Sequence, residues 1–236
     1  MSTSPANPRP VAVVTGASQG LGLALADALA DRGWDLVIDA RRADRLSDAV
    51  EGLRTRTEVT AVAGDVTDPA HRAELVDAAR SRPGPIRLLV NNASTLGPTP
   101  LPRVADLPPA ELGEILTVNV LAPLALAQLA LPLLERSKGT IVNVSSDAAV
   151  EGYEGWGGYG ASKAALEQLS RVLAVENPGL RVLWVDPGDM RTQMHQDAFP
   201  REDISDRPLP EESVPGFVAL VTGSHASGRY QAREVA

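Results

Sequence analysis

Short apolar runs rich in β-branched residues alternate along this chain with longer stretches in which apolar residues recur at helical spacing. The runs predict strands, and the stretches between them predict helices. Strands are expected at residues 11–15, 36–40, 59–63, 88–91, 141–145 and 182–186, and helices at 21–32, 43–54, 69–82, 109–134 and 160–176. The alternation predicts an α/β fold, a doubly wound parallel sheet with helices on both faces.

Two segments fall outside this alternation. Residues 1–10 are polar and proline-rich, which predicts a flexible tail ahead of a single domain over residues 11–236. Residues 189–215 contain several prolines and acidic side chains, which oppose packing and regular hydrogen bonding. We expect a mobile loop there, with an ordinary surface connection as the alternative.

The net charge of −8 argues against nucleic acid or an anionic membrane as a partner, because both present negative phosphates. Cysteine is absent from the sequence, which excludes disulfides and thiolate chemistry, and we predict no metal site. The most apolar stretch, residues 118–134, is interrupted by Asn119, Pro123 and Pro132, so a buried or interface helix is favoured over a membrane span. Residues 1–10 carry no secretory signal, and a cytoplasmic location is expected.

Tyr159 and Lys163 stand one helical turn apart. The lysine ammonium can therefore lie near the phenol and favour its ionised form. A phenol tuned in this way can exchange a proton with an alcohol or a carbonyl near neutral pH. In the alternative, Lys163 pairs with Glu167 on a solvated helix face and Tyr159 is an ordinary half-buried aromatic. Tyr153 has Gly157 at the corresponding position, so it lacks this cationic neighbour.

A glycine-rich turn follows the first predicted strand. Gly16, Gly20 and Gly22 occur where the chain passes into a helix expected from residue 21. Glycine lets a backbone approach a pyrophosphate, which the amide groups of a helix N-terminus can then hold. The spacing differs from the GxGxxG dinucleotide fingerprint. A turn that needs glycine for its geometry alone is the alternative.

Further short motifs follow this turn in a fixed order: Asp65-Val66, Asn91-Asn92-Ala93-Ser94, Asn119, Ser146, Tyr159-x-x-x-Lys163 and Pro187-Gly188-x-x-x-Thr192. In this order and spacing, the motifs resemble those of the short-chain dehydrogenase/reductase family, over about residues 11–192. The resemblance implies a Rossmann fold and an NAD(P)-dependent oxidoreductase that acts on CH–OH or C=O groups.

The resemblance also implies which residues contact the nicotinamide cofactor. They are Gly16, Ser18, Gln19, Gly20 and Leu21 at the phosphates and ribose, Asp65 and Val66 at the adenine, Asn91, Asn92 and Ala93 at the riboses, Tyr159 and Lys163, and Pro187, Gly188 and Thr192 at the carboxamide. Gly22 would serve close packing. Ser94 departs from the glycine that is usual at its position, which adds a side chain at a tight strand end.

The end of the second predicted strand, Asp39-Ala40-Arg41-Arg42, bears on the choice between NADP and NAD. An acidic residue there can accept hydrogen bonds from both adenine-ribose hydroxyls, whereas an arginine can pair with a 2′-phosphate. In the family, the acidic residue of NAD-preferring members usually falls where Ala40 stands. Asp39 should point to the opposite side of the strand, so Arg41 favours NADP(H), while NAD(H) stays possible. In the alternative, Arg41 and Arg42 only begin a solvated helix and bind no cofactor.

By the same resemblance, Tyr159 is the general acid in carbonyl reduction and the general base in alcohol oxidation. Lys163 would stabilise the tyrosinate and hold the nicotinamide ribose, and Ser146 would hold the substrate oxygen. Ser145 competes with Ser146 for this role, but family spacing to the tyrosine selects Ser146. Asn119 would hold a water that joins Lys163 to solvent, with a buried amide that binds local backbone groups as the alternative.

We therefore predict an NADP(H)-dependent carbonyl reductase of a small carbonyl or alcohol substrate. The alternatives are an NAD-dependent alcohol dehydrogenase of the same family and a non-catalytic dinucleotide-binding sensor or scaffold. Loop-like residues 94–100, 147–158 and 189–215 are expected to line the substrate side, where Tyr153 and Trp156 either stack on a ring or fill space.

Self-association is expected as well. Two apolar predicted helices, residues 112–134 and 161–175, could pair across a two-fold axis. A homodimer or a homotetramer is predicted, and the dimer is favoured because residues 226–231 lack the glycine-rich ending of many relatives.

Overall fold

The computed structural model describes residues 8–235, so residues 1–7 of the predicted tail lie outside the described residues. Seven parallel strands form one sheet in the order β3-β2-β1-β4-β5-β6-β7. They are β1 (Val11–Val14), β2 (Asp35–Ala40), β3 (Val59–Ala63), β4 (Ile86–Asn91), β5 (Thr140–Val144), β6 (Arg181–Asp186) and β7 (Gly228–Gln231). The order reverses direction between β1 and β4, which is where doubly wound sheets bind ligands.

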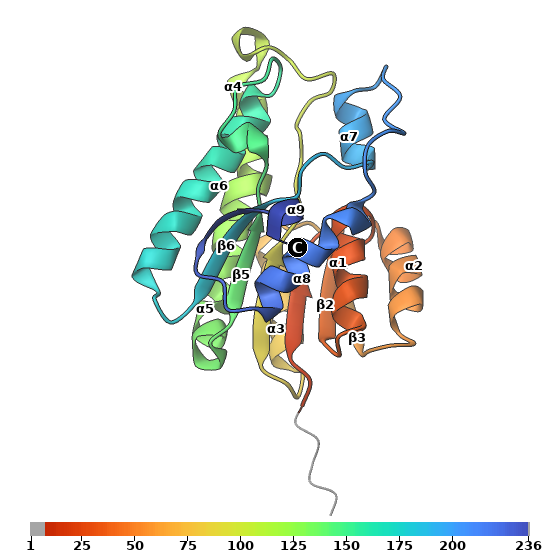
Figure 1. The fold of residues 1–236 in the computed structure, drawn as a ribbon, viewed down its shortest axis with the longest axis vertical. Helices are drawn as coiled ribbons and strands as arrows, with labels where there is room; N and C mark the ends of the chain where they lie inside the picture. The colour runs from red at the N-terminus through yellow and green to blue at the C-terminus, as the bar shows by residue number, and fades with distance from the viewer. Residues whose placement is uncertain (1–7, 236) are drawn as a thin grey trace, which may run out of the picture.

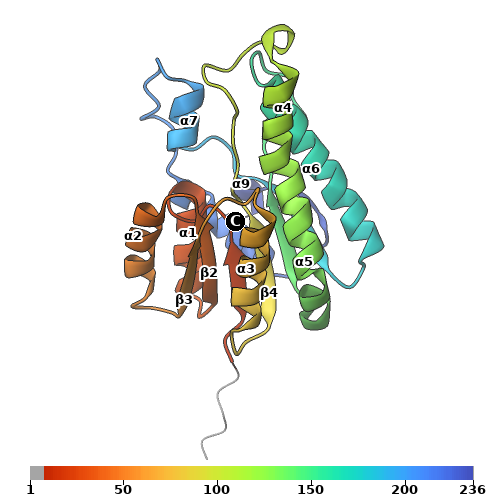
Figure 2. The same ribbon diagram turned by 180° about the vertical axis from the view of Figure 1, so that it is seen from behind.

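Helices cover both faces of this sheet. On one face lie α1 (Gly20–Ala30), α2 (Ala43–Leu53) and α8 (Val214–Thr222), as Figure 1 shows. On the other lie α3 (Pro69–Arg80), α5 (Ala122–Ser137) and α6 (Gly157–Glu176), which Figure 2 brings to the front. Alternate residues of β1 point into two separate apolar cores, so both faces of the strand are buried. The predicted doubly wound Rossmann fold is confirmed.

All six predicted strands are present, and the helices differ from expectation mainly at their ends. α6 begins at Gly157 instead of residue 160, so Tyr159 stands within the helix. β7 adds a seventh strand beside β6. Residues 189–215, expected as a loop, contain the short helix α7 (Gln193–Ala198) and a 3-10 turn, η4 (Pro210–Glu212). Thr192 caps α7, because its hydroxyl accepts the His195 N–H.

The predicted helix 109–134 is continuous but not uniform. It comprises α4 (Pro109–Leu116), one π-helical turn, η2 (Thr117–Leu121), and α5. The run has 29 residues, and its most apolar 18-residue window has a mean hydropathy of 1.8, so it could cross a membrane by length and composition alone. The same run packs against β4, α3 and α6, which makes it a core helix in this fold. α4 and α7 both stand above the carboxyl ends of the strands (Figure 1).

Candidate active site

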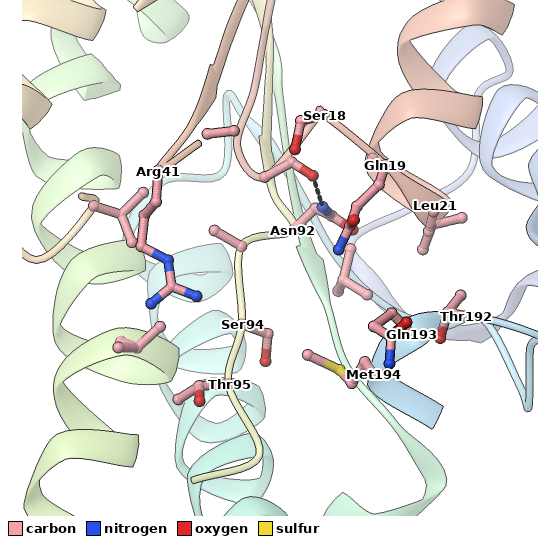
Figure 3. A pocket seen from close by; sticks show the side chains of 18 of the residues that line it. Ser18, Gln19, Leu21, Arg41, Asn92, Ser94, Thr95, Thr192, Gln193 and Met194 are labelled. Atoms are coloured by element: carbon pink, nitrogen blue, oxygen red, sulfur yellow. Dashed lines mark hydrogen bonds between the residues drawn. The ribbon is translucent and has the colours of Figure 1, made fainter. Parts of the chain in front are cut away.

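A cleft of about 1190 Å³ opens at the carboxyl ends of the strands. Its lining comes from the glycine-rich turn before α1, the end of β2, the segment after β4, the start of α6 and residues 187–194. In Figure 3, Arg41 stands on one side of the cleft and Gln19 and Leu21 on the other, with Asn92 between them. Pockets that bind small molecules usually measure about 300–1,000 Å³. The cleft therefore has room for a dinucleotide together with a small substrate.

The glycine-rich turn has the shape that a pyrophosphate needs. Gly16 (φ 65°) and Gly20 (φ 56°) adopt left-handed conformations that favour glycine. A Cβ on Gly22 would stand 2.4 Å from the Gly16 carbonyl oxygen, so the turn and α1 pack closer than any side chain allows. Asn92 Nδ2 donates to the Thr15 carbonyl (2.8 Å) and holds the turn against the end of β4. The residues present thus fit the phosphates of a dinucleotide at the α1 N-terminus.

Asp39 lines the cleft, but its carboxylate is bonded within the glycine-rich turn. Its Oδ1 accepts the Gly16 N–H at 2.7 Å, and its Oδ2 lies 2.9 Å from His71 Nε2 on α3. The hydrogen bond to Asp39 raises the pKa of buried His71 above its usual value. Both carboxylate oxygens are thereby engaged below the turn, in agreement with the strand alternation that predicts Asp39 on the far side of β2.

Three arginines surround the side of the cleft next to β2. Arg41 is exposed and lines the cleft directly after Ala40. Arg42 pairs with Asp44 through an exposed salt bridge. Arg45 donates to the side chain of Gln19. Arg41 is therefore the arginine of this group that has no salt bridge or side-chain hydrogen bond within the described residues, and it can meet a phosphate.

Tyr159 is 8% exposed and stands near the start of α6. Burial raises the pKa of its phenol, and the negative charges of Asp186 and Asp147 raise it further. Hydrogen bonds with Ser146 and Ser94 lower it by less. The direction of this shift is opposite to the one expected from the spacing of Tyr159 and Lys163, because burial disfavours the ionised phenol.

Lys163 is fully buried one turn further along α6. Its Nζ lies 5.4 Å from the centroid of the Tyr159 ring and donates to the Val144 carbonyl at 2.8 Å. Burial lowers its pKa to about 8. The alternative pairing of Lys163 with Glu167 is wrong, because the Glu167 carboxylate accepts from Ser145 Oγ at 2.6 Å and from Arg229 Nε at 2.9 Å.

The two serines at the end of β5 have separate surroundings. Ser145 is buried, its hydroxyl donates to Glu167, and it lines the cleft. Ser146 stands outside that lining, and its hydrogen bond lowers the pKa of the Tyr159 phenol. Ser146 as the residue that holds the substrate oxygen stays a prediction.

Asn119 occupies the π-helical turn η2, where the ladder of the long helix is interrupted. Its amide accepts the Thr95 N–H at 2.9 Å and donates to the Thr95 carbonyl at 2.8 Å and to Ser162 Oγ at 2.9 Å. The side chain thus pins the segment after β4 to α6, as the alternative of a buried amide describes. The water expected beside it stays a prediction.

Comparison with known proteins shows which family has this fold and these motifs. Residues 10–203 match the short chain dehydrogenase family. The chain is 38% identical over 201 residues to sepiapterin reductase from Rattus norvegicus, which covers 79% of this chain and 76% of the rat protein. The chain belongs to the short-chain dehydrogenase/reductase family. It is therefore an NAD(P)-dependent oxidoreductase that acts on a small-molecule substrate.

Solved structures of other short-chain dehydrogenases superpose closely on this one. An alcohol dehydrogenase from the archaeon Thermococcus sibiricus, in complex with 5-hydroxy-NADP, has a TM-score of 0.85 at 28% identity and covers 94% of this chain and 95% of its own. A structure from Shigella flexneri, described as a short-chain dehydrogenase in complex with NADP, has a TM-score of 0.86 at 27% identity, with 96% and 98% covered.

Most of the predicted site residues of this short-chain dehydrogenase come together in the cleft. Those that line it are Gly16, Ser18, Gln19, Gly20, Leu21, Arg41, Asp65, Val66, Asn92, Ala93, Tyr159, Lys163, Pro187 and Thr192. Among residues 8–235, four predicted site residues stand outside this lining: Asn91, Asn119, Ser146 and Gly188. The Asn91 side chain is buried and donates to Asn143 Oδ1 at 2.7 Å, so only its main chain could face a cofactor.

Two charged residues beside the catalytic centre of this short-chain dehydrogenase were missed by sequence reasoning. Arg229 on β7 reaches Glu167, Asp186 (3.4 Å) and the Ser146 carbonyl (3.2 Å) from behind the cleft. Asp147 follows Ser146 directly and hydrogen-bonds with it. Adjacency to the serine could have pointed to Asp147, whereas Arg229 lies 62 residues from Glu167 along the chain.

The substrate side of this short-chain dehydrogenase is apolar. Trp156 packs edge-on against Tyr159, with ring centroids 5.5 Å apart, and tilts against Phe199 at 5.9 Å. Leu96 and Met194 join the same cluster. Trp156 was expected either to stack on a ligand ring or to fill space, and these contacts favour the second interpretation. Tyr153 is half exposed, and its hydroxyl donates to Asp147.

Proposed function

We propose that the protein is a carbonyl reductase that takes its hydride from NADPH and converts an aldehyde or ketone into an alcohol. The observation that carries this proposal is the placement of Tyr159 and Lys163 in the lining of the cleft, with Lys163 Nζ 5.4 Å from the centroid of the Tyr159 ring. A phenol in this place can give its proton to a carbonyl oxygen.

The reduction follows from the positions of three side chains. Bound NADPH would supply the hydride for the carbonyl carbon. Tyr159 gives its phenol proton to the carbonyl oxygen, which completes the alcohol and leaves a tyrosinate. Lys163 lies 5.4 Å from that ring, and its positive charge stabilises the tyrosinate. Ser146 stands beside the phenol at the end of β5, where its hydroxyl can hold the same oxygen.

The preference for NADPH rests on the end of β2. Asp39 is engaged by Gly16 and His71, and Ala40 offers no carboxylate to ribose hydroxyls. Arg41 lines the cleft at this point and suits a 2′-phosphate. Two of the structural relatives carry NADP or 5-hydroxy-NADP, and the rat relative is named a reductase, which supports the same cofactor and direction.

Arg41→Ala is expected to raise the Kd for NADPH by about ten- to a hundredfold, because a hydrogen-bonded charge pair is lost. The Kd for NADH should change by less than about twofold, since NADH has no 2′-phosphate to lose. Nicotinamide fluorescence titrations measure both constants. Arg42→Ala is the matched control, because Arg42 pairs with Asp44 and should affect neither cofactor strongly.

The same titrations separate the alternatives. Equal losses for both cofactors in Arg41→Ala would move the 2′-phosphate elsewhere in the cleft. Tighter binding of NADH by the unmodified protein would favour an NAD-dependent alcohol dehydrogenase. Cofactor binding with no consumption of NADPH by any of a panel of aldehydes and ketones would favour a sensor or scaffold.

We also propose that two chains associate through the helices α5 and α6. Leu129 on α5 and Val172 and Val175 on α6 expose apolar side chains to solvent. Apolar patches of this kind commonly mark contacts between protein chains, and a two-fold axis would use each patch twice. Light scattering of the purified protein tests this association, and a particle of 24.8 kDa would reject it.

A further inference from the structure

His71 and Asp39 form a buried pair beneath the glycine-rich turn. Their side chains are 4% and 1% exposed, and His71 Nε2 lies 2.9 Å from Asp39 Oδ2. The other carboxylate oxygen accepts the Gly16 N–H at 2.7 Å, and the Asp39 carbonyl accepts the Ala17 N–H at 2.9 Å. Asp39 therefore holds two successive amides of the turn, and His71 holds Asp39.

His71 also supports a second part of the cleft. It belongs to the first turn of α3, which packs against β1, β2 and β3 on the face of the sheet shown in Figure 2. A Cβ on Gly64 would overlap the imidazole ring, so the ring packs directly against the backbone that follows β3. The Gly64 N–H donates to the Ala40 carbonyl at 3.0 Å, and Asp65 comes next in the cleft lining. His71 stands outside that lining, so it can act on a ligand only through these neighbours.

The charge of this pair matters because the pyrophosphate of a dinucleotide is itself negative. A buried carboxylate needs a partner that offsets its charge. The charged groups that act on His71 are acidic and come from three parts of the fold: Asp39 of β2, Asp65 after β3, and Asp68 and Glu74 at α3. The hydrogen bond to Asp39 raises the pKa of His71, so the imidazole keeps its proton to a higher pH than usual.

The two protonation states of His71 differ in what they leave below the turn. As a cation, His71 offsets the negative charge of Asp39. As a neutral ring, it can still donate to Asp39 through Nε2, but it offsets no charge. The hydrogen bonds of the turn are thus the same in both states, whereas the charge beneath the pyrophosphate is not.

We propose that His71 is a positioning residue that acts through Asp39, and that its proton offsets the carboxylate charge beneath the pyrophosphate, so that dinucleotide binding is coupled to protonation of His71. Loss of this proton leaves a negative charge below the turn, which repels the pyrophosphate. Affinity for the cofactor is therefore highest below the pKa of His71 and falls as the pH rises through it. By linkage, a bound dinucleotide raises the pKa of His71. The inference requires a dinucleotide in the cleft and does not depend on the direction of hydride transfer.

His71→Gln tests this role, because it removes the charge and keeps a side-chain N–H that can donate to Asp39. The Kd values for NADPH and NADH should both rise by about three- to tenfold near about pH 6. The factor should shrink as the pH is raised, because the unmodified protein then loses the same proton. Both cofactors carry the pyrophosphate, so both should show the effect. Titration of the 2′-phosphate, with a pKa of about 6, affects NADPH alone. Nicotinamide fluorescence measures each Kd.

Asp39→Asn is the complementary change. Its amide oxygen can accept the Gly16 N–H, and its amide N–H can donate to an unprotonated His71, so no charge is left below the turn. Adding His71→Gln to Asp39→Asn should then change neither Kd at any pH. Lys163 has a pKa of about 8 and lines the same cleft. It is common to all of these proteins, so the contribution of His71 is measured as the ratio of Kd values between proteins.

His225→Gln is the matched control, because it removes an imidazole that stands outside the cleft lining. Its Kd values should follow those of the unmodified protein at every pH. If His71 only packs beneath the turn, the ratio of Kd values between His71→Gln and the unmodified protein will be the same at every pH. That result would overturn the proposal.

A second measurement uses the unmodified protein and does not depend on turnover. NMR signals of the imidazole rings report the protonation of each of the 3 histidines, and His195→Gln and His225→Gln assign the signal of His71 by elimination. Saturation with NADP⁺ should raise the midpoint of His71 by about half a unit to one unit. An unchanged midpoint would overturn the inference even in an active reductase. A raised midpoint in a protein that reduces no carbonyl would support the inference and reject the proposed function instead.

Discussion

Tyr159→Phe is expected to lower kcat for carbonyl reduction by about a hundred- to ten-thousandfold, because the proton donor is lost while the ring remains. The phenyl ring keeps its contact with Trp156, so the apolar cluster should persist. The Kd for NADPH should change little, since the glycine-rich turn and Arg41 are untouched. Steady-state rates together with fluorescence titrations measure the two effects separately.

Tyr230→Phe provides the control for this substitution. Tyr230 lies on β7, outside the cleft, and its hydroxyl donates to the Ala226 carbonyl at 2.8 Å. The substitution removes a tyrosine hydroxyl that does not face the cleft. Its kcat should match that of the unmodified protein. If Tyr159→Phe retains turnover, another group donates the proton, and Tyr159 is not the general acid.

Gly22→Ala is expected to weaken NADPH and NADH alike by about tenfold or more, through loss of amide hydrogen bonds to the pyrophosphate. The added Cβ would meet the Gly16 carbonyl oxygen at 2.4 Å and Asn92 Nδ2 at 2.5 Å. A backbone atom cannot yield as a flexible side chain can, so the turn must shift. Titration with both cofactors measures the loss.

Gly52→Ala is the matched change on a neighbouring helix. Gly52 also lies inside a helix, α2, but a Cβ there meets no heavy atom within 4 Å among the described residues. Alanine should therefore stabilise that helix by about 0.5–1 kcal/mol and leave both Kd values unchanged. Cofactor binding that survives Gly22→Ala would show that the turn tolerates a shift and that glycine serves its geometry alone.

The fold could be predicted because most of its strands and helices show a regular spacing of apolar residues in the sequence. The buried strands are short apolar runs, and β2 and β5 are buried at every residue. β7 carries no such pattern, because the strand Gly228–Gln231 is only partly buried at the sheet edge. Its place beside β6 is decided by tertiary pairing. α7 was missed for a similar reason, since its six residues are too few to show a helical period.

The candidate site was predictable to the extent that its residues sit at fixed spacing. The spacing of Tyr159 and Lys163 places both on α6, and the double serine ends β5 as expected. The direction of the Tyr159 pKa was not predictable, because the sequence does not show how deeply the phenol is buried. Nor could spacing reveal Asp186 near that phenol, since β6 reaches it only through the order of strands in the sheet.

Arg229 connects the catalytic centre to an edge strand of the sheet. β7 has four residues and pairs with β6 alone, at the end of the strand order. Short edge elements open more readily than the core, so β7 can separate while the other strands stay folded. Each such opening withdraws Arg229 from Glu167, Asp186 and the Ser146 carbonyl. We therefore expect heat inactivation of this enzyme to begin with fraying at this margin of the sheet, ahead of the cooperative melting of the molecule.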